Sequence, residues 1–392
     1  MNGTGATTLG SVRRLDTRLS RRSGRRRILV DSRTPVNFTM VAPVFRAMSH
    51  DPRVEWYFTA SEEPHRAASI YCEAPDVRIL HPMRAALMKF DAYVASDFTW
   101  ASLPRGACRV QVFHGVAGKY GFDAPDRSMR DWHRLLFINE RRLRNFIASG
   151  AIDPDSPAIR LVGMPKADCL VDGSLDRTEV LLALGIDPSR PTVIYAPTRS
   201  AESSLNAIGP DLIGGLARMP INLIIKLHDR SRDLREPYSG GVDWVSRLQP
   251  LTVPGRVVIA PGHDISPYLA AADVLITDHS SAGFEFLLRD RPIVRIHRPT
   301  LIEKANIHPD YVSLLASVSE SVNDAAGTCA AVEAALADPA ARSGERRRAA
   351  ADLFYRAGGA TARSVDALYD AIELDAAPAV GSQREARCQP SA

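Results

Sequence analysis

The chain has 392 residues, which is enough for two ordinary domains, and 45% of them are hydrophobic and 24% charged, as in soluble globular proteins. Its 49 basic and 45 acidic residues leave a net charge of only +4. The sequence shows no signal-peptide core and no run of about 18 apolar residues, which argues against secretion and against a transmembrane span. We therefore expect a cytoplasmic protein.

Five cysteines are spread along the chain without a CxxC pair or a metal-ligand spacing. An odd number of distant cysteines fits a reducing compartment and argues against both a disulfide framework and a zinc site. We expect neither a metal nor a cofactor. The cysteines are Cys72, Cys108, Cys169, Cys329 and Cys388.

Residues 1–27 form an arm without hydrophobic periodicity, and the sequence predicts that they are disordered. Arginines crowd this arm and only Asp16 opposes them, so most of the excess positive charge lies here. An arginine near an anionic membrane surface contributes about 1 kcal/mol, so the arm is a candidate for holding the protein as a peripheral protein on the inner face of the cell membrane. A solvated tail is the alternative, and we expect no nucleic-acid partner.

From residue 28 onward, short apolar runs alternate with helical stretches, which predicts a parallel sheet covered by helices on both faces. We assign residues 28–165 to a first, N-terminal α/β domain with a helix over Val36–Met48. Its strand candidates are Ile28–Asp31, Arg53–Thr59, Asp76–Leu80, Asp91–Ala95, Cys108–Phe113, Arg134–Ile138 and Ile159–Val162.

Glycine and proline interrupt this alternation between residues 163 and 174, which marks a linker. A second α/β series fills residues 166–345, closing helices occupy residues 346–374, and we expect a disordered tail over residues 375–392. The second series has strand candidates at Thr192–Ala196, Leu223–Leu227, Val257–Ala260, Val274–Thr277 and Ile293–Ile296. Two of its helices have clear end signals, one over Arg177–Leu184 that ends at Gly185 and one capped by Ser266 ahead of Pro267.

Two consecutive doubly wound domains face each other across a cleft, and ligands gather outside the carboxyl ends of their strands. In Asp273–Ile296, an apolar strand ends at Asp278, and a helical pattern begins after Ser280 and Ser281. The two serines then lie on the first turn of a helix, where free N–H groups and the helix dipole favour a phosphate. The alternative is that one serine is only an N-cap, which contributes about 0.5–2 kcal/mol without any ligand.

Three other strand ends carry basic or hydroxyl-bearing side chains, as a phosphate-rich ligand requires. Each has a plainer interpretation, because a histidine after a strand can be a turn residue and a lysine or arginine can be a solvated charge. Asp278 can likewise be only a turn or cap residue. The groups after these three strands are His114, Gly115 and Lys119, then Thr198 and Arg199, then Lys226 and His228.

Two of these positions carry a further expectation. Gly115 has no Cβ, so it lets the chain turn sharply after His114 and lets a ligand approach the backbone. Lys226 lies among apolar residues of a strand that should be buried, and an unpaired ammonium group there would be costly. We therefore expect Lys226 to have an anionic partner.

Several motifs resemble those of the CDP-glycerol glycerophosphotransferase family, whose members polymerise or prime teichoic-acid-like polyol phosphates. The similarity covers most of residues 108–370, and Asp264–Val294 follows the longest signature of the family almost throughout. The shorter matching segments are QVFHGVAGK at Gln111–Lys119, VIYAPTR at Val193–Arg199, IIKLH at Ile224–His228 and a Tyr, Gly and Arg pattern in Phe354–Arg363.

The resemblance implies a GT-B-like fold in which the second domain holds the activated donor and a C-terminal helix crosses back to the first domain. It makes His114 the candidate general base toward the acceptor hydroxyl and His228 a phosphate ligand or charge stabiliser. The donor phosphates would be bound by Ser280, Ser281, Arg199, Lys226 and Thr198, with support from Gly115, Lys119, Asp278 and Glu285.

Four positions depart from the family pattern. Val116 replaces Thr, Lys226 replaces Arg, Asp229 stands where Pro usually follows the second histidine, and His279 replaces Tyr. Lysine in place of arginine loses bidentate geometry, and Asp229 puts a negative charge close to a presumed phosphate. The donor can therefore differ from CDP-glycerol.

The resemblance predicts a transferase that moves a phosphopolyol, most simply glycerol phosphate from CDP-glycerol, onto a hydroxyl of a lipid-linked or growing cell-surface polymer. The first alternative is a GT-B glycosyltransferase using a nucleotide sugar, or the related sugar-nucleotide 2-epimerase. An epimerase needs several acidic residues in the cleft, and only Asp278 and Glu285 are obvious candidates. The second alternative is a non-catalytic nucleotide-binding relative, against which the retention of both His114 and His228 argues.

Overall fold

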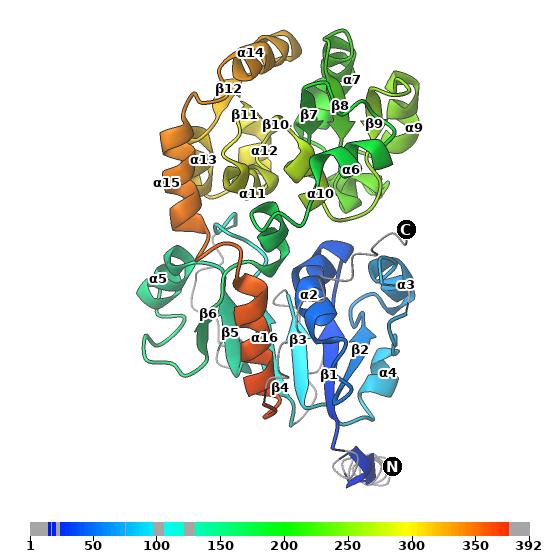
Figure 1. Ribbon diagram of the computed structural model, residues 1–392, viewed down its shortest axis with the longest axis vertical. Helices are drawn as coiled ribbons and strands as arrows, with labels where there is room; N and C mark the ends of the chain where they lie inside the picture. The colour runs from blue at the N-terminus through cyan, green and yellow to red at the C-terminus, as the bar shows by residue number, and fades with distance from the viewer. Residues whose placement is uncertain are drawn as a thin grey trace, which may run out of the picture.

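The computed structural model describes residues 15–16, 18–20, 24–74, 76–96, 106–120, 129 and 131–375. Within these residues the chain forms two six-stranded parallel sheets, which lie one above the other in Figure 1. We call the sheet β1–β6 with its helices the first lobe, and the sheet β7–β12 with its helices the second lobe. The expected α/β architecture is confirmed.

The first lobe has the strand order β2-β1-β3-β4-β5-β6. Its strands are β1 (Arg26–Asp31), β2 (Val54–Thr59), β3 (Ala92–Ala95), β4 (Cys108–Val112), β5 (Arg134–Phe137) and β6 (Ile159–Leu161). Its helices are α2 (Pro35–Met48), α3 (Ala67–Ile70), α4 (Pro82–Ala85) and α5 (Glu140–Ala148), with a short 3-10 helix η1 (Pro64–Arg66). A longer 3-10 helix, η3 (Pro165–Leu170), then leads to the second lobe.

The second lobe has the strand order β12-β11-β10-β7-β8-β9. Its strands are β7 (Thr192–Tyr195), β8 (Asn222–Ile225), β9 (Val257–Ile259), β10 (Val274–Thr277), β11 (Ile293–Ile296) and β12 (Glu320–Val322). Its helices are α6 (Arg177–Ala183), α7 (Ser204–Leu216), α8 (Glu236–Ser239), α9 (Trp244–Leu248), α10 (Ser266–Ala271), α11 (Ala282–Phe286), α12 (Pro299–Lys304), α13 (Pro309–Ser317) and α14 (Ala325–Ala337). The 3-10 helices η4 (Asp229–Arg232), η5 (Gln249–Leu251) and η6 (Leu287–Arg289) lie between them.

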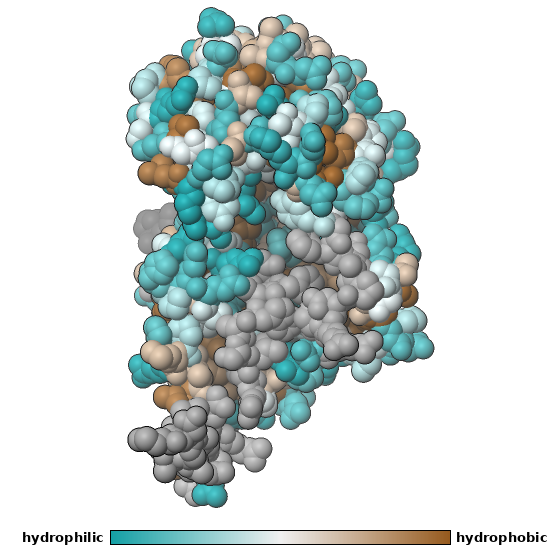
Figure 2. All heavy atoms as spheres, turned by 180° about the vertical axis from the view of Figure 1, so that it is seen from behind, coloured by the Kyte–Doolittle hydropathy of each residue, from teal (hydrophilic) through white to brown (hydrophobic). Residues whose placement is uncertain are grey.

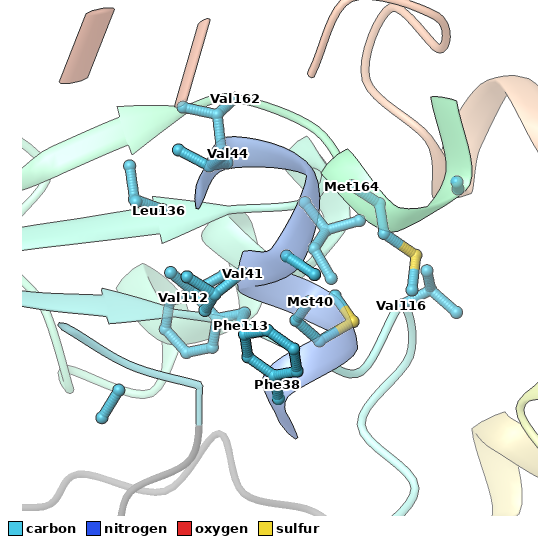
Figure 3. Packing of buried hydrophobic residues seen from close by; sticks show 14 of the residues in the cluster. Phe38, Met40, Val41, Val44, Val112, Phe113, Val116, Leu136, Val162 and Met164 are labelled. Carbon is cyan, nitrogen blue, oxygen red and sulfur yellow. The ribbon is translucent and has the colours of Figure 1, made fainter. Parts of the chain in front are cut away.

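Helix α2 begins at a capping box and packs its apolar side on the first sheet. The Thr34 hydroxyl accepts a hydrogen bond from the Asn37 amide, and the Asn37 side chain accepts one from the Thr34 amide. Figure 3 shows Val41 and Val44 of this helix among Val112 of β4 and other buried side chains that follow or belong to the neighbouring strands. This packing fixes the position of α2 on the sheet beside β4, and His114 lies in the loop that follows β4.

Two terminal helices connect the lobes. Helix α15 (Ser343–Leu353) contacts η6 in the second lobe and α5 in the first. Helix α16 (Ala360–Ala371) then crosses the first lobe, where it packs on α2 and β4 (Figure 1). The Tyr369 hydroxyl donates a hydrogen bond to Asp51 at 3.0 Å, and Arg134 forms an ion pair with Asp370 at 2.9 Å. The expected return of the C-terminal helix to the first lobe is confirmed.

Asp168 in η3 supplies the N-terminal cap that α16 lacks in its own sequence. Its carboxylate accepts hydrogen bonds from the backbone amides of Gly358, Ala360 and Thr361 at 3.0, 3.0 and 2.7 Å. A helix N-terminus leaves such amides without intrahelical partners, and a carboxylate also matches the helix dipole. The carboxylate therefore joins the linker between the lobes to the last helix of the chain.

Some sequence predictions about elements are wrong. Asp76–Leu80 is not a strand, because Ile79 forms only an isolated bridge to Phe58 beyond the edge of the sheet. The edge strand β12 was not predicted, because Glu320–Val322 is too short and polar to show a strand pattern. Ser266 does not cap α10: it is the first helical residue, and its hydroxyl bonds to Asp264.

The arm was expected to be disordered as a whole, and this is wrong for its described residues. Residues 15–16 and 18–20 are helical, and β1 already begins at Arg26. Asp16 forms an ion pair with Arg27 at 2.8 Å and accepts a hydrogen bond from the Lys89 amide at 2.6 Å. The rest of the arm and residues 376–392 lie outside the described residues, and the domain boundaries at 165 and 345 stay a prediction.

Figure 2 shows mostly hydrophilic surface on the coloured part of its face, with a recess between the two lobes. Among the described residues, no helix combines the length and the apolar character that a membrane crossing requires.

We predict that replacing Asp168 by alanine lowers the free energy of unfolding by about 2–4 kcal/mol, because three helix amides lose their acceptor. Urea denaturation of both proteins measures this difference. Asp172→Ala is the matched control, since the side chain of this exposed residue of the same linker accepts, within the described residues, a hydrogen bond only from the Ser174 amide. Equal losses in the two variants would contradict the capping role.

Candidate active site

Two strands that carry predicted site residues are neighbours at the point where the order of the second sheet reverses. β7 pairs with β10 there, with β8 on one side and β11 on the other. Loops leave such a reversal in opposite directions and open a crevice, in which ligands of α/β sheets bind. Thr198 and Arg199 follow β7, while Ser280 and Ser281 follow β10. The predicted donor-phosphate residues of these two loops therefore follow neighbouring strands at this reversal of the sheet.

Asp278 holds these two loops together and is fully buried. One carboxylate oxygen accepts hydrogen bonds from the Thr198 amide at 2.8 Å and the His279 amide at 2.7 Å. The other accepts from the amide and the hydroxyl of Ser204, at 3.0 and 2.9 Å, at the start of α7. Buried carboxylates require such complete hydrogen bonding. Asp278 thus fixes the loops after β7 and β10 relative to each other.

Lys119 reaches from the first lobe into the second. Its ammonium group donates hydrogen bonds to the Thr198 hydroxyl at 3.1 Å and to the His279 carbonyl at 2.6 Å. Burial lowers the pKa of Lys119 to about 8, although the negative charge of Asp278 acts to raise it. The lysine was predicted as a supporting residue, and the structure places it across the boundary between the lobes, next to Thr198.

His114 follows β4, and its ring is oriented by the neighbouring strand. Nδ1 lies 3.0 Å from the carbonyl oxygen of Ser96, which directly follows β3. A carbonyl only accepts, so Nδ1 carries the proton and Nε2 has a free lone pair when the ring is neutral. Asn37 of the α2 capping box supports this arrangement, because its carbonyl accepts a hydrogen bond from the Ser96 hydroxyl at 2.8 Å.

Gly115 does not adopt a positive φ, so the predicted need for glycine in a sharp turn is wrong. A Cβ at this position would lie 3.4 Å from a guanidinium nitrogen of the buried Arg142. The same guanidinium group donates a hydrogen bond to the Gly115 carbonyl at 3.1 Å. Close packing against Arg142 is therefore the constraint at Gly115.

His228 has the opposite tautomer to His114. Its Nδ1 accepts a hydrogen bond from the Arg230 amide at 3.1 Å, so the neutral ring carries its proton on Nε2. Burial lowers the pKa of His228 to about 3; Asp229 opposes this shift, and the positive charges of Arg199, Lys119 and Arg230 add to it. His228 is thus a neutral hydrogen-bond donor surrounded by cations.

The two serines differ in their surroundings. Ser281 occupies the N-cap position of α11, but its hydroxyl makes no capping hydrogen bond. The Ser280 hydroxyl accepts only a long bond from the Ala282 amide at 3.4 Å. Within the described residues, neither hydroxyl forms the short hydrogen bond to a helix amide that an N-cap would form.

Among the residues that the structure describes, Lys226 does not form the ion pair with an anionic partner that the sequence predicted. Its buried ammonium group donates to the carbonyl oxygens of Pro261 and Gly262 and faces the Tyr268 ring at 5.4 Å. Burial lowers the pKa of Lys226 to about 8, while Asp229 favours its charge. Backbone carbonyls therefore accept the hydrogen bonds of this ammonium group. Such partners cannot be recognised from the pattern of a single sequence.

Glu285 forms a buried ion pair with Lys166 of η3 at 2.7 Å. Burial alone would lower the pKa of Lys166, but the neighbouring Glu285 carboxylate raises it. Sequence reasoning missed Lys166, although its position in the linker, three residues after Gly163, was visible. Glu285 supports α11 from the linker side.

Asp229 has a hydrogen-bond partner that the sequence did not suggest. His263 Nδ1 lies 2.6 Å from its carboxylate, and the His263 amide donates to Glu73 of the first lobe at 2.5 Å. Burial alone would raise the pKa of Asp229, but the hydrogen bond from His263 and the charge of Lys226 lower it. One oxygen of the carboxylate next to His228 is therefore held by His263.

The profile of the CDP-glycerol:poly(glycerophosphate) glycerophosphotransferase family matches residues 31–356. The chain belongs to this family. A search of curated protein sequences finds no significant match.

Solved structures give the same fold. A structure of the wall teichoic acid polymerase TagF is 17% identical, with 88% of each chain covered and a TM-score of 0.65. A variant of this polymerase in a structure with CDPG is 16% identical, with 89% of each chain covered and a TM-score of 0.66. The UDP-GlcNAc 2-epimerase from Methanocaldococcus jannaschii is 14% identical, covers 88% of this chain and 99% of its own, and has a TM-score of 0.53. At these identities the likeness concerns the fold alone, which is GT-B-like.

Family membership makes this chain a polyol-phosphate transferase with a CDP-glycerol-type donor and a polymeric acceptor. The resemblance noted in the sequence is thereby confirmed. Among the described residues, no group of three or more His, Cys, Asp or Glu side chains is placed to hold a metal ion.

His279, the residue that departs from the tyrosine of the family, is fully buried between Asp278 and Ser280. Neither of its ring nitrogens has a hydrogen-bond partner within the described residues. Burial lowers its pKa from 6.5 to about 3, and the positive charges of Arg295 and Lys119 and the nearby His297 oppose protonation further. The folded protein therefore contains a neutral His279.

We predict that stability is highest above pH 6.5 and falls as the pH drops toward 3. Below pH 6.5 the unfolded chain binds protons at His228 and His279 that the folded protein does not, which costs about 1.4 kcal/mol per pH unit for each histidine. His279→Met removes one of these contributions, so its unfolding free energy declines less steeply with acid. Urea denaturation between pH 7.5 and 5 measures both slopes.

The exposed His65 provides the control, and His65→Met is expected to keep the wild-type slope. If His279→Met also keeps the wild-type slope, His279 is not held neutral in the folded protein.

Proposed function

We propose that this transferase moves glycerol phosphate from CDP-glycerol onto a hydroxyl of a lipid-linked or growing cell-surface polymer. The observation that carries the proposal is the pair of histidines with opposite tautomers at strand ends of the two lobes. The wall teichoic acid polymerase that shares the fold suggests the class of polymer.

His114 is the proposed general base. The Ser96 carbonyl fixes the proton on Nδ1, so Nε2 faces away from the backbone contact with its lone pair available for the acceptor hydroxyl. The ring is exposed, which allows a polymer end to reach it. As the hydroxyl oxygen attacks the β-phosphate of CDP-glycerol, its proton passes to Nε2, and CMP leaves.

His228 is the proposed charge stabiliser. A neutral imidazole with a proton on Nε2 donates a hydrogen bond to a phosphate oxygen without giving up its own proton, because its pKa of about 3 keeps the charged form out of reach at neutral pH. Electrostatic stabilisation and positioning supply the larger share of catalysis in phosphoryl transfer.

The remaining predicted residues would bind the donor phosphates. Within the described residues, Arg199 makes no hydrogen bond or ion pair, the Ser281 hydroxyl makes no capping hydrogen bond, and the Ser280 hydroxyl accepts one long hydrogen bond. Lys119 and Thr198 lie between these groups. Lys226 would act only as a distant charge, because carbonyl oxygens occupy its ammonium group.

The alternatives are less well supported. Both acidic candidates for an epimerase have structural partners, Asp278 in its four hydrogen bonds and Glu285 in its ion pair with Lys166. A non-catalytic relative would not need a histidine whose tautomer leaves Nε2 free.

We predict that His114→Ala lowers turnover of CDP-glycerol by about 10²–10⁴-fold and leaves its dissociation constant within about twofold of wild type, because the base acts only in the chemical step. Release of CMP in the presence of a glycerol phosphate oligomer measures turnover, and calorimetry measures binding. His81→Ala, an exposed histidine at the start of α4, is the control. Unchanged turnover in His114→Ala would overturn the mechanism.

The same calorimetric measurement with CDP-ribitol, UDP-sugars and GDP-sugars tests the donor. Binding of CDP-glycerol that a Ser280→Ala, Ser281→Ala double variant loses would support both the donor and its cradle. Selective binding of a nucleotide sugar would instead favour a glycosyltransferase.

We further propose that the arm holds the enzyme at the inner face of an anionic membrane. Leu15 and Leu19 are one helical turn apart and are 59% and 55% exposed, beside the arginines of the arm. Apolar side chains next to basic ones are the pattern with which helices lie in a membrane interface.

We predict that a Leu15→Asp, Leu19→Asp double variant sediments several-fold less with vesicles of anionic lipid, because it loses apolar insertion and gains repulsion. Leu234→Asp is the matched control, since Leu234 is also 59% exposed but lies in the second lobe. If the double variant and the control sediment like wild type in low salt, the arm does not bind the membrane in this way.

A further inference from the structure

Tyr238 of α8 gathers three guanidinium groups around one ring. The distances from the guanidinium carbon to the ring centroid are 4.8 Å for Arg230, 5.0 Å for Arg235 and 5.5 Å for Arg199. Arg230 lies two residues after His228, whereas Arg199 follows β7. The tyrosine thus brings together two of the strand ends that form the candidate active site.

Only one of the three arginines is neutralised. Arg235 forms a bidentate ion pair with Asp233, with Nε to Oδ1 at 3.0 Å and Nη2 to Oδ2 at 2.5 Å. Within the described residues, the guanidinium groups of Arg199 and Arg230 form no hydrogen bond and no ion pair. Both contact the Tyr238 ring, and Arg230 also interacts electrostatically with Glu63 and Asp233. Two of the three charges around the ring are thus without an ion pair within the described residues, so a bound anion would stabilise the arrangement.

Contact with the Tyr238 ring restrains these two guanidinium groups. A guanidinium plane that lies on an aromatic ring keeps its N–H groups at its edges, where they can bind a phosphate in a bidentate manner. Both arginines also lie close enough to His228 to lower its pKa, which places them beside the proposed reaction centre.

Arg230 also offers a guanidinium group near His228, where Lys226 offers only an ammonium group. At Lys226 the chain has a lysine where the family has an arginine, and its ammonium group is occupied by the carbonyls of Pro261 and Gly262. Lysine offers a point charge and no planar fork. Four residues further on, the guanidinium group of Arg230 offers a planar fork that forms no hydrogen bond or ion pair within the part of the chain that the structure describes.

We propose that Arg199 and Arg230, which both contact the Tyr238 ring, form a phosphate-binding pair. The inference deepens the proposed function and rests on it. The ligand is a phosphate group, which belongs either to the pyrophosphate of the donor or to a phosphodiester of the acceptor polymer.

The decisive comparison is Arg230→Ala against Arg235→Ala, because the two arginines contact the same ring and differ in whether they are already paired. We expect Arg230→Ala to weaken the binding of CDP about tenfold or more, as measured by calorimetry, and to leave the binding of cytidine unchanged. Arg235→Ala should stay within twofold of wild type for both ligands. Equal CDP affinity in Arg230→Ala and wild type, together with an unchanged KM for the acceptor, would overturn the inference.

A kinetic measurement with a glycerol phosphate oligomer distinguishes the two sources of phosphate. A loss of CDP affinity assigns the pair to the donor. A raised KM for the oligomer with unchanged CDP affinity assigns it to the acceptor, and both outcomes support a phosphate site. A parallel loss of cytidine affinity would mean that the variant disturbs the lobe generally, and would count against the pair.

Variants of the tyrosine test its positioning role. Tyr238→Phe keeps the ring and should bind CDP like wild type, whereas Tyr238→Leu keeps both arginines but should lose affinity several-fold. Arg230→Lys keeps the charge without the fork and should fall between wild type and Arg230→Ala. If wild type does not bind CDP at all, the proposed function fails, and binding of inorganic pyrophosphate to the same variants still tests the pair.

Discussion

The buried carboxylate of Asp278 is the interaction on which the active-site geometry depends. It lies where the order of the second sheet reverses, and its hydrogen bonds to Thr198 and Ser204 tie the loop after β7 to the loop after β10. Since Lys119 of the first lobe bonds to the Thr198 hydroxyl and the His279 carbonyl, this one carboxylate also sets the contact between the lobes. A charge buried in this way is stable only with all its partners in place, so the loops have little freedom to separate.

A second set of buried charges determines how the lobes are joined. Lys166 and Asp168 are two residues apart in η3, and each reaches a different part of the chain: Glu285 in α11 and the amides at the start of α16. The linker therefore acts as a junction between α11 of the second lobe and the helix that covers the first lobe. Removing either partner would leave a buried charge without compensation, which is more damaging than the loss of a surface ion pair.

The departures from the family pattern become understandable as compensated changes. Asp229 is paired with His263, so its charge does not face a phosphate alone. Lys226 is satisfied by backbone carbonyls, while the free guanidinium group of Arg230 lies over Tyr238 nearby. These substitutions are thus consistent with an active enzyme whose anion site uses different side chains, and they do not require a loss of turnover.

The sequence by itself determined the alternation of strands and helices, the end of α6 at Gly185 and the placement of polar residues at strand ends, because hydrophobic periodicity and glycine at a helix end act over a few residues. It also determined the family. The tertiary structure alone decided the tautomers of His114 and His228, the carbonyl partners of Lys226 and the cap that Asp168 provides 190 residues ahead of Gly358. Such contacts join residues far apart in sequence, and each depends on how two sheets and their loops pack, which no local pattern encodes.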